Sequence, residues 1–422
     1  MRIWTIAGVL PLLLSIAAAP EDLPPEVVLL ARIKSHLRGE LSQLPNYTCL
    51  ETVNRFHKEN AHSPFRPLDT VRLEIVYSDH REWYGSPGDA NLGASSPVSF
   101  VGSGLIGSGA FAGALNNILA GAHFVYQGKD ALGDRASVRY DFQFPRQPNA
   151  FAISVPGGVG TVGEKGSVWV DEQSLDLIRL DYHADDIPTY LPLAAQSSNV
   201  SYARVRVGDA SALLAQQADI RLVLSAGVED YDHVEFTHCR AYSAQTEIIF
   251  NTEPVEAAVT PAKVVPAAPP KLPALLTVTV QLVTPVSSRD AVGQLIEGKV
   301  AGEVRYKGKV VVPAGAPVRG RIRRLEHYLG KTTKDRGDFI VGLEFTELEV
   351  NGVRMPFYAD LLSMDKSSVV RPRLSERVPV GNEEITLPEL PGVALFFADG
   401  QTFTIAGGFK TVWRTRGPIR GY

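Results

Sequence analysis

The sequence predicts a mainly β protein: an N-terminal helix on a curved antiparallel sheet, then a Pro/Ala-rich linker and a small β-barrel or sandwich. Three observations lead to this fold class. Apolar residues recur at helical spacing once, near the start of the chain. Later stretches alternate apolar and polar residues with the period of two that is typical of half-buried strands. Prolines crowd residues 253–273, which divide these stretches into two groups.

Residues 1–19 have the layout of a secretory signal peptide. Arg2 supplies a positive start, residues 3–16 are almost wholly apolar, and residues 17–19 are small enough for cleavage. The apolar run is shorter than the roughly 18 residues of a membrane-spanning helix. We therefore expect export to the periplasm or an outer-membrane-associated location, with no transmembrane segment after cleavage. Because no cysteine follows the signal, we expect no lipid anchor, and an exported chain is not expected to bind nucleic acid.

The helix is predicted over residues 24–44, because Pro24 and Pro25 suit a first turn and Pro45 ends the pattern. Its apolar stripe consists of Leu30, Ile33, Leu37, Leu41 and Leu44. The strands that follow are predicted at 71–77, 81–84, 138–144, 166–171, 177–183, 200–207, 219–224, 234–240 and 246–250. Residues 166–171 and 177–181 form a hairpin in this interpretation. We place the first domain at residues 20–252.

Cys49 and Cys239 are the two cysteines of the chain. In an exported protein they most economically form one disulfide, worth roughly 5 kcal/mol in the chain-entropy model. A pair of buried free thiols is the alternative. Because His238 and Cys239 are adjacent on a predicted strand, they point to opposite faces, which does not favour a catalytic thiol.

The layout of a helix followed by antiparallel strands, with the hairpin at 166–171 and 177–181, resembles the fold of periplasmic lipoprotein carriers and sorting factors. The resemblance covers about residues 24–252. It implies a cavity between the helix and the sheet that binds a hydrophobic or lipid-like ligand, with a lipid or lipoprotein as partner. The cavity or flap candidates are Phe100, Leu105, Ile106, Phe111, Leu115 and Ile118.

Residues 102–107 match the G-x-G-x-x-G fingerprint of dinucleotide-binding proteins. That fingerprint requires a preceding strand, a following helix in a parallel βαβ unit, and an acid about twenty residues further on. The surrounding sequence predicts an antiparallel sheet and offers no such acid. We interpret the segment as a glycine-rich apolar flap, and we expect no cofactor.

The second domain is placed at residues 274–422. Its strands are predicted at 276–282, 297–306, 309–313, 317–325 and 338–349, with residues 388–413 closing the sheet. Asn351-Gly352 gives the strongest short hairpin signal. The segments 276–288, 308–315 and 318–320 look like the β-barrel of conjugation and type IV secretion barrel proteins, over about residues 275–325.

Charge differs between the two regions. Residues 274–422 hold 21 basic and 16 acidic residues, a balance of +5, whereas the rest holds 21 and 30, a balance of −9. This difference predicts two domains with unlike surfaces. In residues 318–323 apolar positions alternate with Arg319, Arg321 and Arg323. These arginines are candidates for an anionic partner such as a lipid, a cell-wall polymer or an acidic protein face; a solvated strand face is the alternative.

Neither of two acid/histidine stretches has the order of a known metal motif. Asp181, His183 and Asp185 share one face of a predicted strand and are interpreted as a solvated strand end. The second stretch comprises Asp230, Asp232, His233, Glu235 and His238. From these stretches we predict no metal site. We also predict no catalytic residues, because G-x-S-x-G is absent and the S-x-x-K match at 363–366 stands alone.

Taken together, the residues and the resemblances predict an exported, non-enzymatic protein of the cell envelope that binds a hydrophobic or lipid-like ligand in its N-terminal domain. A structural or adaptor protein that acts on an envelope partner through both domains is the alternative. A secreted hydrolase is the second alternative.

Overall fold

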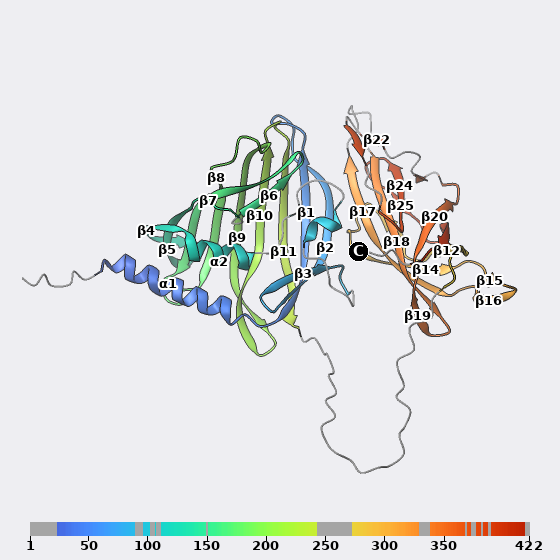
Figure 1. Cartoon of the computed structure of the whole chain (residues 1–422), viewed down its shortest axis with the longest axis horizontal. Helices are drawn as coiled ribbons and strands as arrows, with labels where there is room; N and C mark the ends of the chain where they lie inside the picture. Colours follow the sequence, from blue (N-terminus) through green and yellow to red (C-terminus); the bar gives the residue numbers. More distant parts are fainter. Residues whose placement is uncertain are drawn as a thin grey trace, which may run out of the picture.

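A computed structural model describes residues 23–88, 96–101, 106, 111–148, 151–242, 272–328, 338–367, 369–372, 377–380, 383–386 and 390–417. The predicted signal peptide, nearly all of the predicted linker, the strand at 246–250 and Leu105 lie outside the described residues. The predicted fold class is confirmed: an N-terminal helix and an antiparallel sheet precede a near-closed barrel (Figure 1).

The N-terminal domain is one antiparallel sheet of eleven strands in the order β3-β2-β1-β11-β10-β9-β8-β7-β5-β4, with β6 paired to β7. Its strands are β1 (Tyr47–Lys58), β2 (Arg66–Ser78), β3 (Arg81–Gly85), β4 (His123–Leu132), β5 (Arg135–Phe144), β6 (Phe151–Val155), β7 (Gly158–Asp171), β8 (Leu177–Asp185), β9 (Leu193–Val207), β10 (Ala210–Leu224) and β11 (Glu229–Ala241). The predicted hairpin is confirmed as β7 and β8.

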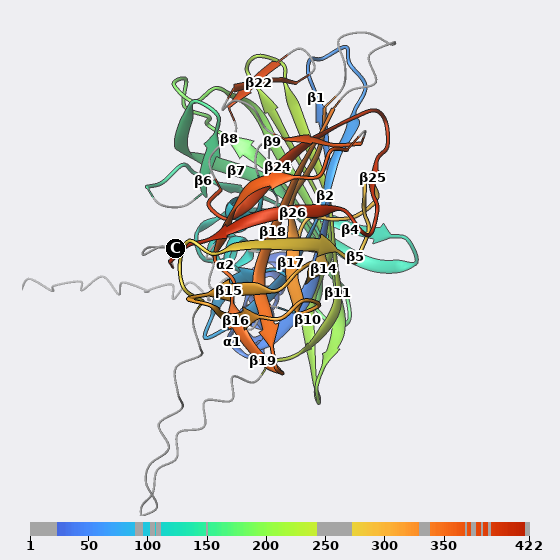
Figure 2. The ribbon, with the colours of Figure 1, turned by 90° about the vertical axis from the view of Figure 1, so that its right-hand side faces the viewer.

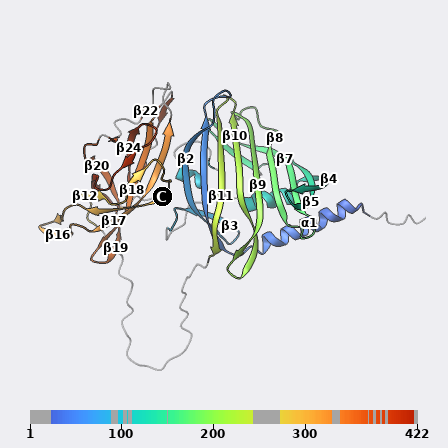
Figure 3. The same ribbon diagram turned by 180° about the vertical axis from the view of Figure 1, so that it is seen from behind.

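Helices cover one face of this sheet, which we call the helix face. They are α1 (Pro25–Ser42) and α2 (Phe111–Gly121), and a short 3-10 turn η1 (Pro97–Phe100) precedes α2. Ile33 and Leu37 of α1 and Leu115 and Ile118 of α2 are buried in one cluster with strand residues such as Val53. The opposite face, which we call the outer face, is seen from behind in Figure 3.

The predicted disulfide is confirmed. Cys49 and Cys239 are bonded across a sequence separation of 190 and join β1 to β11. The register of these two strands shifts between Thr48 and Leu50, and His238 has a φ of 53°. The bridge therefore sits at a β-bulge, where an extra residue on one strand re-aims its neighbours.

The C-terminal domain is a near-closed barrel with the strand order β20-β26-β12-β14-β17-β18-β24-β21, and β19 pairs with β18 (Figure 2). The strands are β12 (Thr277–Leu282), β14 (Leu295–Val300), β17 (Pro317–Tyr328), β18 (Asp338–Val350), β19 (Val353–Pro356), β20 (Ala359–Met364), β21 (Arg371–Pro372), β24 (Val393–Asp399) and β26 (Lys410–Thr415). Near the opening between the two edge strands β20 and β21, the backbone N–H of Gly392 donates to Asp360 Oδ1 at 3.1 Å. This bond draws the start of β24 toward β20.

Three two-stranded ribbons accompany the barrel. They are β13 (Val286–Ser287) with β25 (Thr404–Ile405), β15 (Val304–Tyr306) with β16 (Lys309–Val312), and β22 (Arg377–Val380) with β23 (Glu383–Thr386). The predicted hairpin between β18 and β19 is confirmed, with Val350 opposite Val353. Asn351 and Gly352 have φ values of 52° and 78°, the left-handed pair that a two-residue type I′ turn requires.

The two domains are joined by backbone pairing as well as by the chain. Beyond the reach of β3, the exposed edge of β2 pairs with Val292 in a parallel bridge. Arg72 N–H donates to Val292 O, and Val292 N–H donates to Thr70 O, each at 2.9 Å. Gly293 has a φ of 90°, and a Cβ there would overlap the carbonyl oxygen of Arg72. A glycine is therefore required where the barrel contacts the sheet edge.

Buried charges lie beside this junction. Arg55 Nε donates to Asp69 Oδ1 at 2.7 Å, and Arg324 donates to Glu326 at 2.8 Å. All four side chains are almost fully buried. Arg55 also lies within electrostatic reach of Glu326, so charges from both domains act on one another across the interface.

Candidate functional site

The described residues of α1, α2 and the sheet pack closely together. A gap of about 30 Å³ lies among Leu37, Leu41, Leu115 and Tyr202, which is room for about one water-sized group. Of the predicted cavity residues, Leu115 borders this gap, while Ile106 and Ile118 are buried in the helix-face core.

Three further predicted positions remain. Phe100 is half-buried against the same core. Phe111 is the first residue of α2, but its side chain is not among the parts of the chain that the structure describes, and Leu105 lies outside the described residues. That these residues bind a ligand stays a prediction.

The outer face carries a far larger hollow, a groove of about 1020 Å³. Its lining comes from seven strands, β4, β5, β7, β8, β9, β10 and β11, together with Phe65 from the connection between β1 and β2. Neither described helix contributes to it. The groove crosses the strands instead of following one of them.

One line of side chains crosses the groove from strand to strand, and we call it the acidic row. Strand register places its members opposite one another in turn: Asp141, Ser167, Asp181, Asn199 and Asp219. Side chains two residues apart on a strand share a face, so residues in register on neighbouring antiparallel strands form such a row. The aspartates thus fall on every second strand of the row.

A row on one side of the acidic row is built around an aromatic ring. Arg139 lies opposite Trp169, which lies opposite Arg179. The two guanidinium carbons are 5.3 and 5.5 Å from the indole centroid. The indole N–H of Trp169 donates to Asp130 at 2.9 Å. These contacts hold the ring in one orientation at the groove.

The row on the other side is basic and polar. Its members are Gln143, Lys165, His183, Ser197 and Arg221. Lys165 pairs with Asp185 at 3.0 Å, at the rim of the groove. Arg221 pairs with Glu229.

The aspartates of the acidic row are held by donors from the same face. Arg139 Nε and Ser167 Oγ donate to Asp141 at 2.9 and 2.6 Å. Arg179 donates to Asp181 through two bonds at 2.7 and 2.8 Å. Such fork-to-carboxylate pairs are geometrically specific.

Asp219 is held at the far end of the row. His233 contacts its Oδ1 at 2.8 Å, and Tyr231 donates to the same atom at 2.6 Å. Burial acts to raise the pKa of Asp219, but these hydrogen bonds outweigh it and hold the pKa below its usual value. Tyr231 is raised to a pKa of about 12, first by burial and then by its bond to Asp219. This end of the groove therefore carries a fixed carboxylate and a neutral phenol at neutral pH.

The structure separates the members of the predicted acid/histidine stretches. Asp181 and His183 line the groove, whereas Asp185 forms an ion pair with Lys165. His233 and Glu235 share one face, as alternation predicts, and His238 pairs locally with Thr237. Sequence reasoning missed the groove, because only strand register brings Asp141, Asp181 and Asp219 into line.

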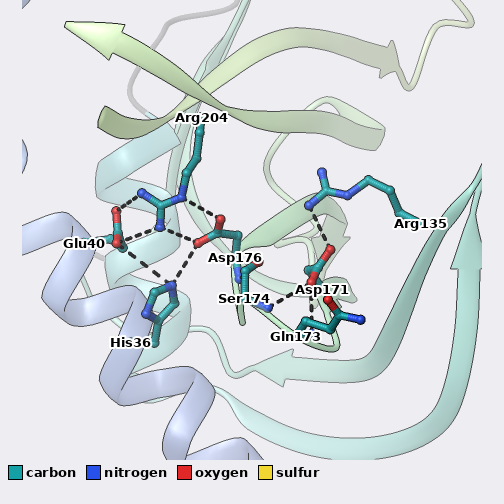
Figure 4. A network of polar contacts seen from close by, with 8 residues as sticks. All are labelled: His36, Glu40, Arg135, Asp171, Gln173, Ser174, Asp176 and Arg204. Atoms are coloured by element: carbon teal, nitrogen blue, oxygen red, sulfur yellow. Dashed lines mark hydrogen bonds and ion pairs between the residues drawn. The ribbon is translucent and has the colours of Figure 1, made fainter. Parts of the chain in front are cut away.

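Among the described residues, one group of side chains has metal-ligand spacing: His36, Glu40 and Asp176 (Figure 4). Arg204 donates to Glu40 at 2.9 Å and to Asp176 at 2.6 Å. Burial acts to raise the pKa of Asp176, but hydrogen bonds from Arg204 and His36 lower it below its usual value. The guanidinium already supplies the countercharge that a metal ion would bring, so the group fits a structural ion pair better than a metal centre.

The predicted basic row of the barrel is engaged within the chain. Arg319 pairs with Glu347 at 2.9 Å, and Arg321, which is buried, donates to Gly293 O at 2.9 Å. Arg323 lies over the ring of Phe100, 5.8 Å from its centroid. Arg323 therefore contacts the N-terminal domain, whereas Arg319 and Arg321 are bonded within the C-terminal domain. An external anionic partner for the row stays a prediction.

No protein family and no curated protein matches this sequence. The solved structures that are similar to about half of the chain include the following two. One is a DUF1329 family protein from Desulfovibrio piger, with 11% identity and a TM-score of 0.27, over 51% of this chain and 92% of that one. The other is a putative outer membrane lipoprotein-sorting protein domain from Vibrio parahaemolyticus, with 12% identity and a TM-score of 0.27, over 52% and 94%. Likeness at this level assigns no function to the chain.

Proposed function

We propose that the chain is an exported, non-enzymatic protein of the cell envelope whose N-terminal domain binds an extended ligand in the groove of the outer face. The observation that carries the proposal is a difference in open volume. The groove on the outer face has about 1020 Å³, whereas the gap beneath the helices has about 30 Å³. Ligand sites are concave and combine apolar surface with a few convergent polar groups. The groove has both.

The disulfide and the bonded aspartates also support this function. The Cys49–Cys239 bridge suits an oxidising compartment outside the cytoplasm. No helix within the described ranges combines the length and apolar character that crossing a bilayer requires. Asp141, Asp181 and Asp219 are each bonded to a neighbouring donor, which fixes them in place as parts of a binding surface.

A hydrophobic or lipid-like ligand on the helix face is the second candidate. It is favoured by the apolar gap that Leu37, Leu41 and Leu115 border. An acyl chain needs far more room than this gap offers, so α2 would have to move away from the sheet for such a ligand to enter. The two candidates place their ligands on opposite faces of one sheet.

Native mass spectrometry separates them. The full chain, exported from its own signal and purified from the envelope fraction without detergent, is compared with the variants Trp169→Ala and Leu115→Asp. We expect a bound mass that is lost in Trp169→Ala and kept in Leu115→Asp. Tyr190→Ala, which removes an exposed ring outside the groove, is the matched control.

Other outcomes have definite meanings. A bound mass that extracts as lipid, lost only in Leu115→Asp while circular dichroism shows that this variant is folded, overturns the groove and supports the second candidate. A bare protein with its disulfide intact rejects both ligand proposals and leaves the adaptor function. Release of a shortened product from a bound oligomer contradicts the non-enzymatic assignment and leaves the hydrolase.

A further inference from the structure

We infer that the ligand of the groove is a neutral, extended, β-linked oligosaccharide that lies along the acidic row, across the strands. This inference rests on the proposed function and specifies its ligand. It is carried by three properties of the groove: its charge balance, the spacing of its aspartates and the placement of its aromatic rings.

The charge of the lining is balanced. Its fully charged side chains are three bases, Arg139, Lys165 and Arg221, and three acids, Asp141, Asp181 and Asp219. An anionic polymer or a phosphate group needs an excess of positive charge, and here aspartates occupy the middle of the groove. A cationic ligand would in turn be repelled by Arg139, Lys165 and Arg221, which flank the acidic row. A neutral ligand avoids both repulsions.

The spacing of the acids suits a chain of sugars. Aspartates occur on every second strand of the acidic row. Two strand spacings amount to about 9.6 Å, which is close to the length of a disaccharide in an extended β-linked chain. One disaccharide would therefore span the distance between successive carboxylates, with Ser167 or Asn199 lying between them.

The chemistry of the row matches hydroxyl groups. A sugar hydroxyl both donates and accepts, and two adjacent hydroxyls can share a carboxylate and the base bonded to it. Arg179 with Asp181 and Arg139 with Asp141 offer such donor and acceptor pairs side by side. These pairs already orient one another, so little side-chain entropy is lost when a ligand binds.

Aromatic rings line two parts of the groove. Trp169, flanked by its two arginines, lies on β7, between the strands that carry Asp141 and Asp181. Tyr231 and Phe65 lie together at the β11 end, with ring centroids 5.8 Å apart. The C–H faces of pyranose rings pack on aromatic rings, whose apolar area adds binding energy without adding charge. Rings at two separate places suit a ligand that crosses several strands.

The row also fixes the length of the ligand. From Asp141 on β5 to Asp219 on β10 the row crosses four strand spacings, or about 19 Å. That is the length of two disaccharides. A tetrasaccharide should therefore fill the row, and further sugar units should add little.

The test is isothermal titration calorimetry of the full mature chain with chitotriose, chitotetraose, chitohexaose and cellohexaose. Chitotetraose and chitohexaose are expected to bind equally well, and chitotriose about tenfold more weakly. Maltohexaose, which coils, and an anionic hyaluronan hexasaccharide should bind more weakly than chitotetraose.

Variants locate the binding. Asp181→Ala and Trp169→Ala should each weaken chitotetraose binding by about tenfold or more. Asn199→Ala removes an amide with little risk to folding and should weaken binding in the same direction. Glu172→Ala, which removes an acid bonded to Lys129 outside the groove, is the matched control and should bind as the parent chain does. Circular dichroism shows that each variant is folded.

The outcomes separate this inference from the proposed function. If no neutral oligosaccharide binds, while the bound mass seen by native mass spectrometry still depends on Trp169, the groove holds another class of ligand and the glycan inference is wrong. If oligosaccharides bind but Asp181→Ala, Trp169→Ala and Asn199→Ala bind as the parent does, the site lies elsewhere. In that case both the inference and the proposed function fail.

Discussion

Burial favours the protonated form of several carboxyl groups of the N-terminal domain. Burial raises the pKa of Glu82 to about 7 and that of Glu164 to about 8, and it raises the pKa of Glu51 well above its usual value. An acid whose pKa is higher in the folded chain binds its proton more tightly there. Above the unfolded pKa of 4.5 the folded state then holds more protons, so stability falls as pH rises toward the folded pKa.

The variant Glu164→Gln tests this pH dependence. At pH 8 it should raise the free energy of unfolding by roughly 2 kcal/mol or more, because the amide needs no proton. At pH 5 the side chain is already neutral and the change should be small. Urea unfolding followed by tryptophan fluorescence measures both. An equal gain at the two pH values would contradict the assignment, and Glu172→Gln, at a half-buried acid paired with Lys129, is the control.

The disulfide makes a second prediction at the residue scale. Replacing Cys49 and Cys239 together by serine should lower the free energy of unfolding by roughly 2–5 kcal/mol. The loss arises because the unfolded chain is no longer closed into a loop of 190 positions. Chemical unfolding of the double variant beside the oxidised parent measures it. An unchanged unfolding midpoint would show that the bridge contributes nothing.

Sequence patterns foretold some residues and missed others for a physical reason. The disulfide followed from the cysteine count, because an exported chain with two cysteines has one pairing. The groove did not follow, because alternation assigns Asp181 and His183 to a face but cannot say which residues of other strands stand beside them. Asp141 and Asp219 join Asp181 through strand register alone.

At the element scale, patterns worked where local chemistry decides the structure. The first helix was expected over 24–44 and spans Pro25–Ser42, bounded by the same prolines. The Asn351-Gly352 turn formed as predicted. β1 escaped prediction because Glu51 and Arg55 occupy buried positions on its helix face. A charged residue where an apolar one is expected hides the period of two.

A glycine allows two strands to lie close together at the groove. Gly166 lies on β7, and a Cβ there would overlap the carbonyl oxygen of Asp181 on β8. Gly166→Ala should therefore force β7 and β8 apart and destabilise the domain. Gly113 of α2 has open space around its Cβ position, and Gly113→Ala should stabilise the chain slightly, by about 0.5–1 kcal/mol. Thermal unfolding of both variants checks the pair; an unaffected Gly166→Ala protein would contradict the geometry.

At the scale of the whole molecule, the sequence predicts two domains separated by a tether, and the structure adds a direct junction. Val292 extends the edge of β2, and charged pairs from both domains are buried beside it. Composition marks where prolines gather, but it cannot reveal that an edge strand of one domain pairs with a loop of the other. An open edge strand is a common site of such pairing.

The variant Gly293→Val tests the junction. A side chain at this position overlaps Arg72 O and the backbone has a positive φ, so the barrel should detach from the sheet edge. Small-angle X-ray scattering should then show a larger radius of gyration. Gly302→Val, where a Cβ meets nothing, is the control. Unchanged scattering from Gly293→Val would show that the junction does not depend on this backbone pairing.

We propose that this protein holds its ligand on the outer face of the eleven-stranded sheet and not in the space beneath the helices. A crystal structure of the chain with chitohexaose is the decisive experiment. We expect sugar density along Asp141, Asp181 and Asp219, with Trp169 in contact and the helices unmoved. Density between α2 and the sheet, or sugar bound away from the acidic row, would contradict it.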